Sequence, residues 1–133
     1  EADDATYRRV MTLAGDALSH GYTVIVDATF LHRSRRDRFR ALADERGLPG
    51  LILDVTAPPD LLRRRVEERA AAGNDPSDAG VRVLAAQLER PHGLDADELP
   101  RAVIVDTSQP VDADELASTI RGRIRNESDT GDP

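Results

Sequence analysis

The chain has 133 residues, of which 39% are hydrophobic and 32% are charged, a balance typical of one modest globular domain rather than of a disordered chain. Its net charge of −7 argues against a general nucleic-acid surface, and the absence of Cys excludes disulfides and thiolate metal sites. No apolar stretch approaches the roughly 20 residues that a membrane span needs, and no signal peptide is recognisable. We therefore expect a cytoplasmic protein. All 18 basic residues other than His are Arg, because the chain contains no Lys.

The first part of the chain predicts a helix, a strand and a turn between them. Residues 2–20 carry apolar side chains at three- and four-residue steps, which indicates an amphipathic helix, and Gly21 suits its C-terminal cap. Residues 22–28 contain a β-branched run, Val24–Val26, typical of a strand buried on both faces. That strand would place Asp27 at its C-terminal end, where open α/β sheets bind their ligands.

Two further helices with a strand between them are predicted next. The pattern Ser34–Asp37 resembles a capping box at the start of a helix over 34–46, which Gly47 ends. Residues 50–55 read as a second strand. The proline pair at 58–59 suits the opening of a third helix, over about 59–72.

The remaining sequence continues the alternation of helices and strands. We predict a fourth helix over 77–90, a third strand over 102–106, a last helix that begins near Asp112, and a disordered polar tail at 127–133. Alternating elements of this kind predict an α/β fold, a parallel β-sheet flanked by helices, in one domain over 1–126.

Asp27 is the first residue that suggests chemistry. A carboxylate at the end of a buried strand can hold Mg²⁺ through water or take a proton from a hydroxyl group. It can equally cap the turn that follows the strand, and the sequence leaves both interpretations open. Thr29 is a second polar residue near the same position.

Arginines form two groups along the chain. Arg65 and Arg69 share one face of the third helix, where two guanidinium groups can clamp a polyphosphate, although a solvated helix surface would show the same pattern. A second group follows the Asp27 segment and could bind an anionic substrate or simply be solvated: Arg33, Arg35, Arg36, Arg38 and Arg40. Positive charge at a helix start opposes the helix dipole, which favours a functional reason for the second group.

In their order and spacing, these segments resemble a known family. Val24–Phe30 resembles the strand that carries the Walker B-like aspartate of small P-loop kinases, and most closely that of AAA-domain kinase-like proteins, which are related to polynucleotide kinase, gluconate kinase and zeta toxin. Arg38–Ala43 is similar to their next helix. Leu61–Arg69 and then Asn74–Ala79 resemble their arginine-bearing lid. Val103–Thr107 is similar to their last strand, whose following loop borders the adenine.

The resemblance implies a three-layer P-loop kinase architecture with ATP and Mg²⁺ as cofactors. It implies that Asp27 is the metal-linked or general-base carboxylate and that Arg65 and Arg69 are lid arginines on the ATP phosphates. Thr107 would lie at the nucleotide, and Arg38 would contact substrate or phosphate. Proteins of this type are often fused to an aminoglycoside phosphotransferase-like domain.

The chain departs from the family at one essential motif. A chain without Lys cannot contain the phosphate loop G-x-x-x-x-G-K-[ST], whose backbone amides and lysine hold the phosphates. In this class the strand before that loop lies between the strands predicted here at 22–28 and 50–55. We therefore expect an N-terminally incomplete domain whose full-length parent transfers phosphoryl groups from ATP to an unidentified acceptor, while the isolated chain is inactive.

Two alternatives remain. The chain could be a degenerate kinase fold without catalysis that serves interaction or regulation. It could also belong to a nucleic-acid end-processing kinase, which the arginines at 33–40 favour and the net charge of −7 opposes.

Overall fold

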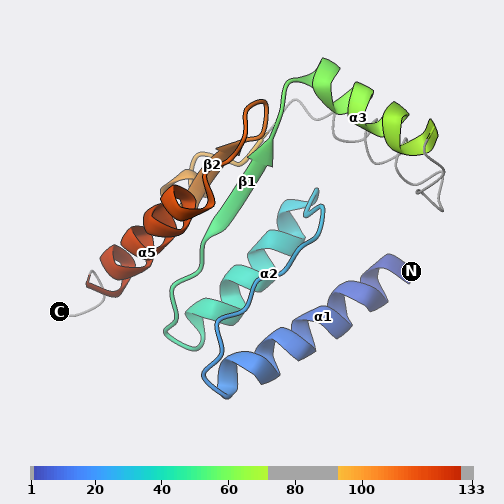
Figure 1. Ribbon diagram of the computed structural model, residues 1–133. Helices are drawn as coiled ribbons and strands as arrows, with labels where there is room; N and C mark the ends of the chain where they lie inside the picture. Colours follow the sequence, from blue (N-terminus) through green and yellow to red (C-terminus); the bar gives the residue numbers. More distant parts are fainter. Residues whose placement is uncertain (1, 72–92, 130–133) are drawn as a thin grey trace. The chain divides into compact units, whose positions relative to one another are not determined.

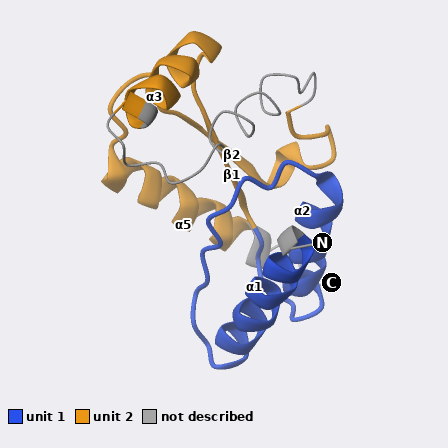
Figure 2. Ribbon diagram, turned by 90° about the vertical axis from the view of Figure 1, so that its right-hand side faces the viewer, with its two compact units in different colours: residues 1–50 blue, residues 51–133 orange. Residues whose placement is uncertain are grey.

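The computed structural model describes residues 2–71 and 93–129, which form two compact units, residues 1–50 and residues 51–133 (Figures 1 and 2). The elements are α1 (Ala2–Ser19), α2 (Arg33–Asp44), β1 (Ile52–Thr56), α3 (Pro59–Ala71), a 3₁₀ turn η1 (Leu99–Arg101), β2 (Ala102–Asp106) and α5 (Ala113–Asp129). The helix predicted over 77–90 lies outside the described residues. That the two units form a single domain stays a prediction.

The first unit consists of two helices that run in the same direction, joined by a segment that returns along them (Figure 1). Near the helix starts, Arg35 of α2 pairs with Asp4 of α1 at 3.4 Å. Near their ends, the guanidinium of Arg46 and the side chain of Leu42 lie against Gly15. Two helices of the same direction require a connection as long as the helices themselves, and an extended segment supplies that length in few residues because it rises about twice as far per residue.

The returning segment corrects one prediction, because residues 22–28 do not form a strand of a sheet. Tyr22 is 68% exposed and Ile25 is 83% exposed, so the segment is not buried on both faces either. A strand needs a partner for its backbone N–H and C=O groups, and neither described strand pairs with this segment. The β-propensity of its residues therefore favours an extended backbone, but this segment is not part of a sheet.

Both helices of the first unit end on glycines, as the sequence predicts. Gly21 has φ 81° and Gly47 has φ 61°, in the left-handed region that glycine tolerates best. The amide of Gly21 donates to the carbonyl of Leu18, and the amide of Tyr22 donates to the carbonyl of Ala17. Together these two bonds satisfy carbonyls that the last turn of α1 would leave unpaired.

The start of α2 differs from the prediction. The helix begins at Arg33, and the residue before it, His32, makes no side-chain capping bond. Asp37 does not act in a capping box, because its carboxylate pairs with Arg33 at 3.4 Å and with Arg40 at 3.1 Å. The carboxylate of Asp37 thus forms ion pairs with two arginines of its own helix.

The second unit contains a parallel pair of strands, as predicted. β1 pairs with β2 in a register that runs from Ile52 opposite Ala102 to Thr56 opposite Asp106. Parallel strands need a long crossover, and the segment between these two includes α3. α5 follows β2 and continues to Asp129, three residues past the predicted end of the last helix.

Burial is uneven within the described residues. The buried apolar side chains are small, with Val66 of α3, and Val103 and Val105 of β2 as the largest. Large apolar side chains on the strands remain exposed, with Val55 at 63% and Ile104 at 57%. In its described part the chain is therefore a mixed α/β protein with four α-helices and a small parallel sheet of two strands, consistent with a partial P-loop fold.

Candidate functional site

The carboxyl ends of the two parallel strands are tied to α3 by one arginine. Arg65 donates from Nη1 to the hydroxyl Oγ1 of Thr107 at 2.9 Å and from Nη2 to the carbonyl oxygen of Thr107 at 2.6 Å. Its guanidinium thus binds both the hydroxyl and the carbonyl group of Thr107, the first residue after β2. This pair of hydrogen bonds is called the fork of Arg65 on Thr107. Two residues that the sequence proposes for nucleotide contact, 42 positions apart, are brought together here.

Thr107 in turn fastens β2 to β1. Its backbone N–H donates to the carbonyl of Thr56 at 2.8 Å, and its hydroxyl donates to the same carbonyl at 2.9 Å. The hydroxyl therefore accepts from Arg65 and donates to Thr56, so its single O–H donor is used. The result is a continuous chain of hydrogen bonds from α3 across the ends of both strands.

The loop after β2 is shaped by its own side chains. Asp106 accepts a hydrogen bond from the backbone N–H of Ser108 at 2.8 Å. This bond and the Ser108 hydroxyl favour the charged carboxylate and lower the pKa of Asp106 from its ordinary value. Asp112 accepts from the amides of Asp114 and Glu115, which starts α5. Side-chain to backbone bonds thus define both ends of this loop.

The arginines of α3 divide into three kinds. Two of them pair with carboxylates of their own helix, Arg63 with Asp60 at 3.1 Å and Arg64 with Glu68 at 3.7 Å. Arg65 forms the fork on Thr107. Arg69 is exposed and has no partner among the described residues.

Asp27 and Thr29 lie in the first unit, both exposed at the end of the returning segment. The turn that follows holds Phe30 at φ 42°, an unusual value for an aromatic residue. Contacts on both sides of its backbone fix this conformation: Phe30 N–H donates to the Tyr7 hydroxyl at 3.3 Å, and Arg36 Nη1 donates to the Phe30 carbonyl at 3.0 Å. Asp27 therefore stands a few residues before a turn whose geometry the surrounding side chains impose.

Sequence inspection missed an aromatic cluster between α1 and α2. The rings of Tyr7, Phe30 and Phe39 meet edge to face, with centroids 5.5 Å and 5.1 Å apart. The Arg35 guanidinium lies 4.1 Å from the centre of the Tyr7 ring. The only available signal was compositional, because both Phe residues and both Tyr residues fall within the first 39 positions.

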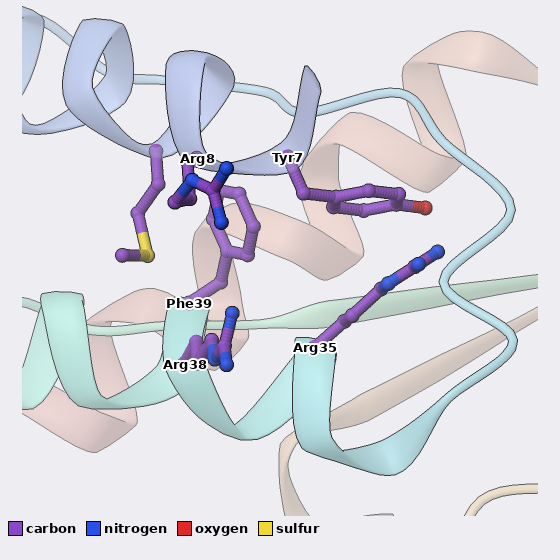
Figure 3. Close-up of a pocket in the computed structure, with 6 residues that line it drawn as sticks. Tyr7, Arg8, Arg35, Arg38 and Phe39 are labelled. Atoms are coloured by element: carbon purple, nitrogen blue, oxygen red, sulfur yellow. The ribbon is translucent and has the colours of Figure 1, made fainter. Parts of the chain in front are cut away.

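A small pocket opens beside this cluster (Figure 3). Arg38, predicted to contact substrate or phosphate, lines it together with Tyr7, Arg8, Met11, Arg35 and Phe39. Arg38 is exposed on α2, whereas its neighbour Arg36 is buried against the Phe30 turn. The arginines of residues 33–40 are therefore not a uniformly solvated run.

The family model described as an AAA domain matches residues 1–94. The chain belongs to this family. The resemblance to P-loop kinase-like AAA domains is thereby confirmed, and the matched residues include Asp27, Arg38, Arg65 and Arg69. β2 and Thr107 lie beyond the match. No curated protein and no solved structure matches the chain.

The side chains of this AAA domain fit ATP and Mg²⁺ in part. Mg²⁺ keeps several waters and commonly takes only one or two protein carboxylates, so the exposed Asp27 suits a water-mediated contact. No group of three or more His, Cys, Asp or Glu side chains in the described segments is arranged to hold a metal by itself. The 133 residues contain no Lys, so the lysine of a phosphate loop is not among them. Within the described residues, no helix is both long and apolar enough to span a membrane.

Proposed function

We propose that this AAA domain is the lid-bearing part of a kinase and that the full-length protein transfers a phosphoryl group from ATP to an acceptor. The family supports nucleotide binding, and the chemistry that ATP and Mg²⁺ would supply is a transferable phosphoryl group with its charge partly neutralised. The phosphate-loop lysine that this class uses is not among the 133 residues, so the proposal concerns the full-length protein.

The observation that carries the proposal is the fork of Arg65 on Thr107. Ligands of parallel α/β sheets bind outside the carboxyl ends of the strands, and this fork holds α3 at that edge. An arginine has five N–H donors, and the fork uses two of them. Arg65 can therefore position the loop after β2 and still offer donors to a phosphate.

The other residues take separate roles in this proposal. Arg69 lies one helical turn beyond Arg65 and is open to solvent, so it would close over the transferring phosphoryl group and offset its charge. Thr107 would border the nucleotide. Asp27 would hold a Mg²⁺-bound water or accept the proton of the acceptor hydroxyl.

The decisive experiment is phosphoryl transfer by the full-length protein carrying Asp27→Asn. The change keeps the size of the side chain and removes its charge, so we expect turnover to fall close to background. Asp16→Asn is the matched control, because Asp16 is an exposed carboxylate near the end of α1. Transfer of the γ-phosphate of radiolabelled ATP gives the rate. Near-normal turnover of Asp27→Asn would overturn the assignment.

A second candidate is a non-catalytic domain that serves interaction or regulation. The observation in its favour is the absence of Lys from the chain, because the phosphate loop depends on that residue. Calorimetric titration of the full-length protein with Mg·ATP separates the two candidates. Saturable binding that weakens in Arg69→Gln but not in Arg63→Gln supports the kinase, and absence of binding supports the interaction domain.

A further inference from the structure

The pocket between α1 and α2 combines positive charge with aromatic and thioether surface. Arg8 and Arg38 extend from opposite sides of the gap between the two helices, and the Phe39 ring lies behind the Arg8 guanidinium (Figure 3). Tyr7 and Met11 complete the wall on the α1 side. Both arginines are exposed, so their guanidinium groups are accessible at the mouth of the pocket.

The positive charge at this pocket is not balanced within the described part of the chain. Arg35 is compensated by Asp4 at 3.4 Å and stacks on Tyr7. Arg8 and Arg38 have no carboxylate partner there. Arg8 and Arg38 line the same pocket, so an anion bound between them would gain a favourable contact with each positive charge.

Positive and negative charges are distributed differently in the two units. Residues 1–50 carry eight Arg and eight Asp or Glu, whereas residues 51–133 carry ten Arg and 17 Asp or Glu. The whole net charge of −7 therefore belongs to the second unit, and the first unit is neutral by formal charge.

We propose that this pocket binds a phosphate group carried on an aromatic body, the chemistry of a nucleoside phosphate. Arginine donates two parallel hydrogen bonds to phosphate oxygens, and Arg8 and Arg38 can approach one phosphate from two helices. The rings of Tyr7 and Phe39 and the thioether of Met11 offer a surface for a planar base. The pocket is too small to enclose a base, so the ligand lies across its mouth.

This binding is independent of phosphoryl transfer and is measured without ATP or Mg²⁺. The further assignment of this pocket as the acceptor site of the kinase rests on the proposed function. In that case the acceptor is a nucleotide or a nucleotide end. Loss of catalysis in Asp27→Asn and loss of binding at Arg38 are therefore separate results.

The test is an NMR titration of the 133-residue chain, with the methyl group of Met11 as the reporter. Met11 is the single Met of the sequence and lines the pocket, and Met11→Leu assigns its signal. The probes are a 5′-mononucleotide, a 5′-phosphorylated hexanucleotide, inorganic phosphate and a hexaglutamate peptide. We expect the Met11 signal to shift with the two nucleotide probes, and the mononucleotide to bind more tightly than inorganic phosphate.

Substitution of the two arginines decides whether they hold the phosphate. Arg8→Gln and Arg38→Gln should each weaken mononucleotide binding about tenfold, because each removes a charged hydrogen-bond donor. Arg9→Gln is the matched control, since Arg9 is an exposed residue of α1 that does not line the pocket, and its affinity should stay within about twofold. Circular dichroism checks that each variant is folded.

Three results would overturn the proposal. The first is the absence of any Met11 shift with the nucleotide probes. The second is equal weakening by all three arginine substitutions, which would indicate diffuse charge attraction only. The third is equal affinity for the mononucleotide and for either inorganic phosphate or hexaglutamate, because it would remove the role of the rings or that of the phosphate. Binding of both nucleotide probes supports the proposal, and tighter binding of the hexanucleotide assigns the site to nucleic-acid ends.

Discussion

At the scale of single residues, arginine chemistry separates positions that look alike in the sequence. α3 carries four arginines, and only one of them reaches across to the strand ends. Arg63 and Arg64 pair within the helix, which the sequence spacing already indicates for Arg64 and Glu68. The hydrogen bonds between Arg65 and Thr107 could not be predicted from the sequence. The two residues are 42 positions apart and meet only through the parallel strand pairing.

Removal of the Arg65 fork should destabilise the protein more than removal of a surface ion pair. We expect Arg65→Ala to lower the free energy of unfolding by about 1–3 kcal/mol, because a charged donor to a part-buried residue is lost. Arg63→Ala, which breaks only an exposed pair with Asp60, should cost less than about 1 kcal/mol. Urea unfolding measures both. Equal losses would mean that the fork contributes nothing beyond an ordinary surface contact.

At the scale of elements, the helices are the part of the protein that local rules describe best. α1, α3 and the start of α5 lie close to their predicted ranges, and the glycine at the end of α1 has the conformation expected of it. The capping box at the start of α2 failed because Asp37 found two arginine partners on its own helix. The failure therefore has an electrostatic cause that the capping pattern alone does not include.

Two glycine substitutions should act in opposite directions on these helices. Gly21→Ala should cost about 1 kcal/mol, because an alanine at φ 81° is strained although nothing lies within 4 Å of the added methyl group. Gly122→Ala should stabilise by about 0.5–1 kcal/mol, since it lies inside α5 with equally open space and alanine is the better helix former. Thermal unfolding gives both values. A stabilising Gly21→Ala would contradict the cap assignment.

At the scale of the whole molecule, both units expose large apolar side chains to solvent. Ile25 in the first unit and Val55 and Ile104 in the second are each more than half exposed. Sequence analysis predicted Ile25 to lie in a strand buried on both faces, and Val55 and Ile104 to lie in strands of a sheet flanked by helices. Among the described residues no third strand joins the sheet.

Exposed apolar surface of this kind should make the chain associate. We expect the sedimentation coefficient of the 133-residue chain to rise with concentration. Ile25→Thr combined with Ile104→Thr should reduce that rise, because threonine keeps the extended preference and removes apolar surface. Val105→Thr is the contrasting variant: Val105 is only 7% exposed, so the change should lower stability and leave association unchanged. Association that persists in the double variant would place the contact elsewhere.

The sequence by itself determined the family, the α/β class, the ranges of α1 and α3, the parallel strands β1 and β2, and the residue types suited to phosphate. These features depend on local periodicity, on capping residues and on the order of short motifs, which are all written along the chain. Only the tertiary structure decided that Arg65 binds Thr107, that Phe30 is held in a left-handed turn, and that Arg8 and Arg38 line one pocket beside an aromatic cluster. The physical reason is that a hydrogen bond or a ring contact needs both partners in place, and the chain brings distant partners together only when helices and strands pack.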